Sequence, residues 1–97
     1  MAIRSLRSMV AGQRPLIVAA DVTVAEVARR MHESRTGAAL VADGPRLVGI
    51  FTERDALFRV LADARDPRTT PVAQVMTRDP QTIRLLRKLM IEWGGRQ

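Results

Sequence analysis

Two apolar runs separated by a turn constrain most strongly what this chain can fold into. Ala38 to Val41 and Leu47 to Phe51 each have the length and composition of a buried strand. Asp43-Gly44-Pro45 lies between them, where glycine permits a positive φ and proline fixes its own φ. A connection this short joins neighbouring strands in antiparallel fashion. The sequence therefore predicts a β-hairpin over residues 38–51.

A helix is predicted before the hairpin. Thr23 and Glu26 have the spacing of a capping box, in which the side chain of each residue accepts from the backbone N–H of the other. Apolar residues then repeat at i, i+3, i+4 and i+7 up to Met31, and Gly37 is expected to end the helix. A short apolar run at residues 15–18 predicts a strand ahead of this helix.

A second helix is predicted directly after the hairpin. Thr52 can cap it, Asp55 stands at the third position after the cap, and Asp66-Pro67 is expected to close it. Its predicted apolar stripe consists of Ala56, Leu57, Val60, Leu61 and Ala64. The order strand, helix, strand, strand, helix predicts an α/β unit with both helices on one face of a small sheet.

The rest of the chain carries shorter signals. Residues 67–72 are interpreted as a linker, in which Thr70-Pro71 has the form of a helix N-cap followed by proline. Residues 79–83 are predicted to be extended. From Leu85 to Trp93 the apolar residues fall on one helical stripe that Gly94-Gly95 ends, which predicts an amphipathic helical tail.

Composition narrows the function classes. The chain has no cysteine and a single histidine, His32, which argues against thiolate or histidine metal sites and against a catalytic triad. No apolar run approaches the roughly 20 residues of a membrane span, and no secretory signal is evident, so we expect a cytoplasmic protein with no membrane partner. Without a phosphate-binding loop, dinucleotide fingerprint or nucleophile elbow, we expect no enzymatic activity and no catalytic residue.

The ordered set of signals resembles a CBS domain, the module named after cystathionine β-synthase. The resemblance rests on the helix after Thr23, the strand from Ala38, and the segment Leu47-Val48-Gly49-Ile50-Phe51-Thr52-Glu53-Arg54-Asp55, where glycine is followed by threonine and then aspartate. Val75-Met76-Thr77 through Ile83 resembles the opening of a second unit. The resemblance implies an α/β fold, a CBS-type β-α-β-β-α unit with a short sheet backed by two helices, plus a C-terminal helical tail.

The same resemblance divides the chain. Residues 1–69 would form one CBS domain, and residues 70–97 the truncated start of a second unit that ends in the amphipathic tail. The match of Met90-Ile91-Glu92 to Met31-His32-Glu33 leaves the second unit shorter than the first. CBS domains usually work in pairs, so a homodimer is expected to supply what a single unit lacks.

In the CBS family the cleft between two units binds adenosine-containing ligands such as AMP, ATP or S-adenosylmethionine. The resemblance assigns Asp55 to the ribose hydroxyls, and a carboxylate, being an acceptor only, can take both hydroxyl protons. Thr52 would offer its hydroxyl to ribose or phosphate, and Arg54 could pair with phosphate. The residues implied to line the adenine pocket are Ile17, Val18, Ala38 and Ala39.

Each of these assignments has a plainer alternative. Thr52 and Asp55 could merely cap a helix, Arg54 could be a solvated helix residue, and the apolar strand residues could be core. The leading hypothesis is therefore a regulatory, signal-transduction module that senses adenine nucleotides at a CBS–CBS interface and acts on a partner protein. We expect the module to require no cofactor. The first alternative is a structural homodimerisation module without a ligand.

Nonspecific nucleic-acid binding is the second alternative. The formal net charge is +6 and nearly all the positive charge is arginine. Only 3% of residues are aromatic, and the basic residues alternate with acidic ones, so the sequence favours this function least among the three.

Overall fold

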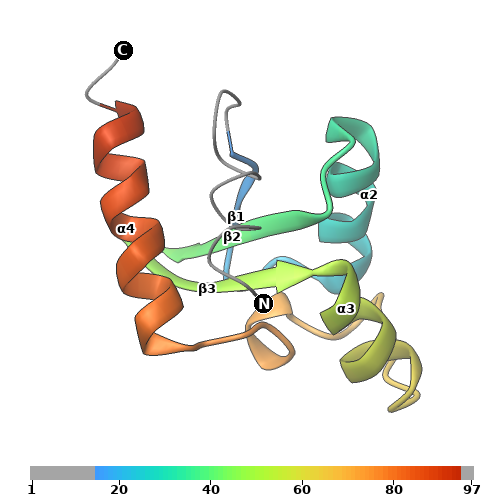
Figure 1. Ribbon diagram of the computed structural model, residues 1–97. Helices are drawn as coiled ribbons and strands as arrows, with labels where there is room; N and C mark the ends of the chain where they lie inside the picture. The colour runs from blue at the N-terminus through green and yellow to red at the C-terminus, as the bar shows by residue number, and fades with distance from the viewer. Residues whose placement is uncertain (1–14, 95–97) are drawn as a thin grey trace.

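The computed structural model describes residues 15–94 of the 97-residue chain, together with most of the side chains in that range. A three-stranded sheet with the order β1-β2-β3 lies at its centre (Figure 1). Strand β1 (Ile17–Ala19) pairs in parallel with β2 (Ala38–Asp43), which pairs antiparallel with β3 (Arg46–Thr52). The predicted hairpin is confirmed, and Gly44 in its turn has a φ of 59°. The apolar stripe predicted for the tail includes Met90 and Trp93, and Gly95 is expected to help end it. These two side chains and Gly95 lie outside the described residues.

Helix α2 (Val24–Ser34) begins where the sequence predicts, but ends earlier than expected. Thr23 Oγ1 accepts from the Glu26 N–H at 3.3 Å, whereas the Glu26 carboxylate bonds to Arg29 and Arg30 instead of returning to Thr23. Those two arginines hold the pKa of Glu26 below its usual value. The helix stops at Arg35, which adopts a left-handed φ of 54°, so the prediction that Gly37 ends it is wrong.

The second predicted helix is irregular, and most of its predicted apolar stripe is not buried. It consists of α3 (Glu53–Asp55) and a π-helical turn, η1 (Ala56–Leu61), followed by a turn at residues 62–64 rather than by a helix that continues to Asp66-Pro67. Because each π-helical turn holds more residues than an α-helical one, the 3.6-residue spacing no longer keeps the stripe on one face. Val60 is buried, but Leu57 and Leu61 are 52% and 68% exposed.

Two expectations for the following residues are also wrong. The Thr70 hydroxyl donates to the Asp66 carbonyl and caps no helix, and the next element is a single 3₁₀ turn, η2 (Val72–Gln74). Residues 79–83 are not extended, because α4 (Pro80–Gly94) already begins at Pro80. Asp79 Oδ1 accepts from the backbone N–H groups of Gln81 and Thr82, at 2.9 and 3.4 Å, so an N-cap followed by proline starts the helix one turn earlier than expected.

Apolar side chains cover both faces of the sheet. On one face, residues of α2, η1 and η2 pack on the sheet in a core that includes Val27, Phe51 and Val72. On the other face, Leu86 of α4 packs on Leu40 and Ile50. The prediction that the two helices flanking the hairpin share a face is confirmed, and Figure 1 shows α4 standing apart from them across the sheet.

The left-handed Arg35 yields a stability prediction. A residue with a Cβ is sterically strained at positive φ, whereas glycine is not. Arg35→Gly is therefore expected to stabilise the fold by about 0.5–1 kcal/mol. Thermal unfolding followed by circular dichroism would measure the change. Ala28→Gly, on the exposed face of the same helix, is the matched control and is expected to destabilise by about 1 kcal/mol. A lower midpoint for Arg35→Gly would contradict the explanation.

Candidate ligand site at the start of helix α3

Thr52 and Asp55 form a reciprocal cap where β3 passes into α3. Thr52 Oγ1 accepts from the Asp55 N–H at 3.2 Å, and Asp55 Oδ2 accepts from the Thr52 N–H at 3.0 Å. The Thr52 hydroxyl also donates to Oδ2 at 3.1 Å. Both residues are buried, at 7% and 5% exposure. The predicted capping role is therefore confirmed, and the hydroxyl and carboxylate expected to meet a ligand lie side by side.

A residue that sequence reasoning did not select completes the surroundings of this carboxylate. Thr77 Oγ1 lies 3.0 Å from Asp55 Oδ1 and 3.3 Å from Oδ2. Arg59 Nε lies 3.5 Å from Oδ1, and its Nη1 donates to the Met76 carbonyl at 3.0 Å. The Val75-Met76-Thr77 resemblance marked this segment as the start of a new unit, but no local pattern indicates a contact across 22 positions of sequence.

A small hollow of about 200 Å³ opens over these groups. Its polar lining combines two carboxylates, hydroxyls and two guanidinium groups, and the Arg54 guanidinium lies 5.3 Å from the centroid of the Phe58 ring. This combination can accept hydroxyl protons and attract an anion at one place. The lining residues are Ile50, Thr52, Arg54, Asp55, Phe58, Arg59, Thr77, Asp79 and Thr82.

The structure does not bring all the predicted site residues to this hollow. Thr52, Arg54 and Asp55 line it, and Ala38 is the register partner of Thr52. Val18 and Ala39, at 2% and 1% exposure, belong to the core on the opposite face.

Ile17 is also separated from the predicted site. It pairs with Leu40 on β2 and lines a different hollow of about 510 Å³ beside Leu47 and Arg87. The strand pleat explains why Val18 and Ala39 are separated from Ile17 and Ala38, because adjacent positions of one strand point to opposite faces of a sheet.

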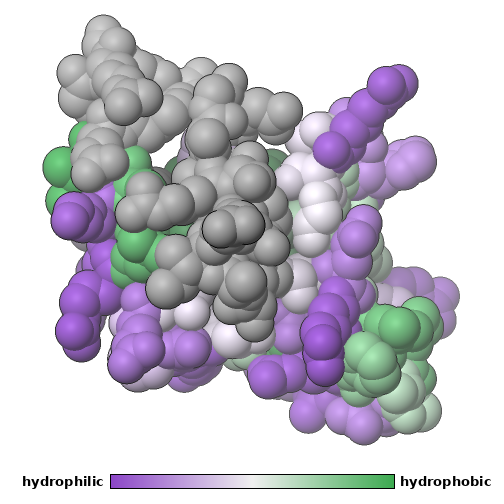
Figure 2. All heavy atoms as spheres, in the orientation of Figure 1, coloured by the Kyte–Doolittle hydropathy of each residue, from purple (hydrophilic) through white to green (hydrophobic). Residues whose placement is uncertain are grey.

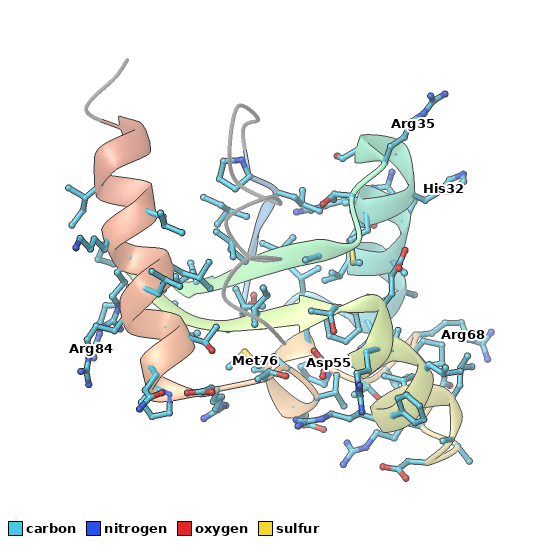
Figure 3. All side chains as sticks on the ribbon, in the orientation of Figure 1. His32, Arg35, Asp55, Arg68, Met76 and Arg84 are labelled. Carbon is cyan, nitrogen blue, oxygen red and sulfur yellow. The ribbon has the colours of Figure 1, made fainter. Side chains whose placement is uncertain are left out.

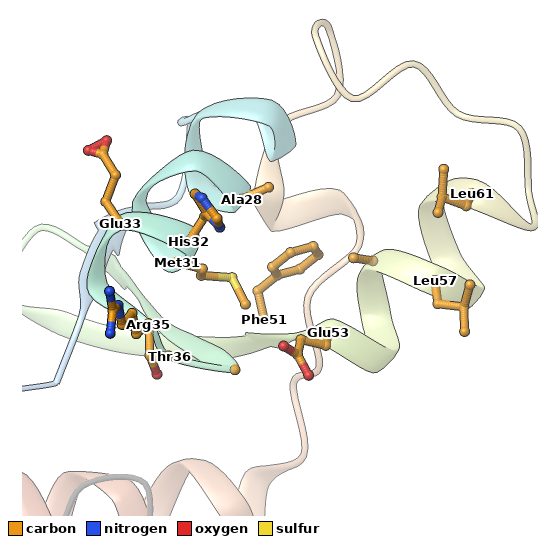
Figure 4. A pocket seen from close by; sticks show the side chains of 12 residues that line it. Ala28, Met31, His32, Glu33, Arg35, Thr36, Phe51, Glu53, Leu57 and Leu61 are labelled. Carbon is orange, nitrogen blue, oxygen red and sulfur yellow. The ribbon is translucent and has the colours of Figure 1, made fainter.

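A larger groove of about 780 Å³ lies between α2 and the α3–η1 segment (Figure 4). Met31 and Phe51 line it together with the exposed side chains of Leu57 and Leu61. The sequence analysis missed this groove because it assigned both leucines to the buried stripe. No pattern in the sequence indicates that the regular helix ends at Asp55 and continues as the π-helical turn η1.

Comparison with known proteins identifies the family. Residues 7–62 match the family model of the CBS domain. The chain belongs to the CBS domain family. It is 40% identical over 68 residues to the meiotically up-regulated gene 70 protein of Schizosaccharomyces pombe, a match covering 70% of this chain but only 9% of that protein. The resemblance and the α/β fold class drawn from the sequence are thus confirmed.

Two solved CBS structures share this fold. A putative signal-transduction protein with CBS domains from Burkholderia ambifaria MC40-6 has a TM-score of 0.67 and 34% identity, covering 70% of this chain and 50% of that one. A hexameric CBS-CP12 protein from bloom-forming cyanobacteria has a TM-score of 0.61 and 28% identity, covering 67% of this chain and 39% of that one. Within residues 15–94, no helix has the length and apolarity needed to cross a membrane.

The segment of residues 75–79, here called the connector, holds Thr77 in the site and runs along β3 (Figure 1). Ile50 and Thr77 exchange two backbone hydrogen bonds, at 3.0 and 2.8 Å. Beside them, Met76 packs on Gly49 so closely that a Cβ at Gly49 would lie 2.4 Å from the Met76 sulfur and 3.0 Å from the Thr77 carbonyl oxygen. The missing side chain of Gly49 thus makes room for the connector.

Gly49→Ala is therefore expected to displace the connector. Overpacking of this kind lowers the free energy of unfolding by about 1–3 kcal/mol, which urea denaturation would measure. Gly37→Ala is the matched control, because a Cβ there would meet its nearest atom, in Glu53, at an ordinary 3.5 Å. Equal unfolding free energies for the two variants would show that the connector does not need the space at Gly49.

Proposed function

We propose that this chain is a non-catalytic regulatory module that binds an adenine nucleotide, with Asp55 receiving the ribose hydroxyls. The observation that carries the proposal is the buried Asp55 carboxylate, whose oxygens face a hollow flanked by Arg54 and Arg59. A vicinal diol has two O–H donors at a spacing that suits the two oxygens of one carboxylate. Membership of the CBS family supports a regulatory role.

The two arginines favour a phosphate over a neutral or cationic group. Arg54 and Arg59 line the hollow together with Asp55 and Asp79, and guanidinium groups form strong charge-assisted hydrogen bonds with phosphate oxygens. AMP and ATP carry that phosphate next to the ribose, whereas S-adenosylmethionine carries a sulfonium. Within the adenosine-containing ligands, we therefore expect AMP and ATP to bind more tightly than S-adenosylmethionine.

The site needs a second unit for the base. The hollow of about 200 Å³ is smaller than the roughly 300–1,000 Å³ of typical small-molecule pockets, so it suits a ribose and a phosphate but not a whole nucleotide. Of the four residues implied for the adenine pocket, only Ala38 lies beside Thr52. The adenine ring would therefore contact another CBS unit, which a second copy of the chain can supply.

Calorimetric titration of AMP into the protein tests the nucleotide site. Asp55→Asn keeps an oxygen for the Thr52 cap but changes the acceptor for the diol, so we expect the Kd for AMP to rise at least about tenfold. Deoxyadenosine monophosphate, which lacks the 2′-hydroxyl, should bind the wild type as weakly as AMP binds the variant. Asp63→Asn, at an exposed aspartate outside the hollow, is the control. No heat from AMP, ATP or S-adenosylmethionine at millimolar concentration would refute the proposal.

A structural homodimerisation module remains the second candidate, and exposed apolar side chains favour it. Leu57, Phe58 and Leu61 are 52%, 55% and 68% exposed, next to the groove between α2 and η1. Figure 2 shows an apolar patch at this corner of the molecule. Clustered exposed apolar residues are typical of interaction sites, and one related CBS-CP12 protein is described as hexameric.

Light scattering coupled to gel filtration tests self-association through this patch. We expect the mass of a dimer for the wild type and of a monomer for Leu61→Glu, because a carboxylate cannot be buried there without a partner. Gln81→Glu adds the same charge at an exposed position of α4 and should leave the dimer intact. A monomeric wild type, or a dimeric Leu61→Glu variant, would show that the patch does not pair two copies.

A further inference from the structure

We propose that the Thr77 hydroxyl competes with the ligand for Asp55, so that a nucleotide must release the connector from β3 in order to bind. This inference rests on the proposed function, because it takes Asp55 as the acceptor for the ribose. It adds a consequence that ribose recognition alone does not have: occupancy of the hollow changes how the start of α4 is held.

The hydrogen bonds of Asp55 show why competition arises. Its two oxygens accept from the Thr52 N–H, the Thr52 hydroxyl and the Thr77 hydroxyl, and Arg59 Nε approaches to 3.5 Å. A carboxylate offers about four lone-pair positions. The Thr52 N–H and hydroxyl occupy Oδ2, and the Thr77 hydroxyl lies 3.0 and 3.3 Å from Oδ1 and Oδ2, so only Oδ1, which the Arg59 donor approaches, keeps a position. A diol that bonds to both oxygens must therefore replace a donor that is already present.

The four donors differ in how easily they can leave. Both Thr52 donors belong to the cap between β3 and α3, and their loss would unwind the start of the helix. Thr77 and Arg59 belong to other segments and can withdraw without breaking that cap. A ribose hydroxyl is chemically equivalent to the threonine hydroxyl as a donor, so Thr77 is the natural group for it to replace.

The same ligand would loosen a second contact of the connector. Arg59 approaches Asp55 through Nε and donates from Nη1 to the Met76 carbonyl. A phosphate that recruits this guanidinium draws it away from Met76. Figure 3 shows Asp55 and Met76 on neighbouring segments below the sheet. Ribose and phosphate together would therefore remove the Thr77–Asp55 and Arg59–Met76 hydrogen bonds, which join the connector to the α3–η1 segment.

Besides the core packing of Val75 and Met76, what remains is a short tie between the connector and β3. The antiparallel bridge of Ile50 and Thr77 consists of two backbone hydrogen bonds. Two residues further, Asp79 caps α4 through the N–H groups of Gln81 and Thr82 and also lines the hollow. Release of Thr77 thus acts on the residue that fixes the beginning of α4, which provides a physical route from the hollow to this helix, whose Thr82 also lines the hollow.

Thr77→Val tests the competition, because it keeps the shape of the side chain and removes the hydroxyl. We expect its Kd for AMP to fall roughly three- to tenfold relative to the wild type, which corresponds to one hydrogen bond that the ligand no longer has to displace. Thr77→Ser keeps the hydroxyl and should bind as the wild type does. Thr69→Val changes an exposed threonine outside the hollow and should also leave the Kd unchanged.

Amide hydrogen exchange on the wild-type protein gives a second readout that needs no variant. AMP is expected to accelerate exchange at the Ile50 and Thr77 amides, whose bridge it would loosen, while the Asp55 amide in the cap stays protected. Slower exchange at Ile50 and Thr77 would mean that the connector closes on the ligand, which overturns the inference.

The outcomes separate the two proposals. If the wild type binds AMP and Thr77→Val binds it equally or more weakly, the competition is wrong and the nucleotide site stands. If neither protein binds AMP, ATP or S-adenosylmethionine, the proposed function fails and the competition fails with it. If only Thr77→Val binds measurably, the result supports both proposals, because the hydroxyl then masks a competent site.

Discussion

The burial of one carboxylate constrains the arrangement of three segments in this molecule. A charged group taken out of water is stable only when donors replace the lost hydration, and Asp55 is 5% exposed. Its donors come from the end of β3, from η1 and from the connector. Each of these segments must therefore stay in place for the charge to remain satisfied, and among the described side chains no buried nitrogen or oxygen lacks a partner.

Register in the hairpin determines which groups can meet at this carboxylate. Ala38 pairs with Thr52 and Leu40 pairs with Ile50, so a shift by one residue would move both β3 residues to the other face of the sheet. Gly49 then provides the space in which Met76 lies, and the adjacent Ile50 binds the backbone of Thr77. A strand that would otherwise be an exposed edge thus receives the connector as a short fourth segment, which positions the Thr77 hydroxyl over Asp55.

The parts of this structure that could be predicted from sequence are those determined by neighbours in the chain. The hairpin, the Thr23 cap and the Thr52–Asp55 cap depend on residues within a few positions of one another, and local patterns predicted them. The connector contact of Thr77 depends on packing between distant segments, and local patterns missed both this contact and the π-helical turn. The residues implied for the adenine pocket do not lie together for a different reason. Val18 and Ala39 are apolar strand residues, and the pleat directs their side chains into the core between the sheet and α2.

These features bear on the proposal that a domain with so small a hollow has a regulatory role. A ligand shifts an equilibrium only by the difference in its affinity for two arrangements, so a rigid site that binds without moving a segment would transmit nothing. Here the groups proposed to receive ribose and phosphate, Asp55 and Arg59, are also hydrogen-bonded to the connector. The free energy needed to release the connector would lower the affinity for the ligand. The same release would couple the hollow to α4. If the proposed competition holds, a weak nucleotide affinity is therefore expected, and contacts of the base with a second unit would offset part of the free energy of releasing the connector.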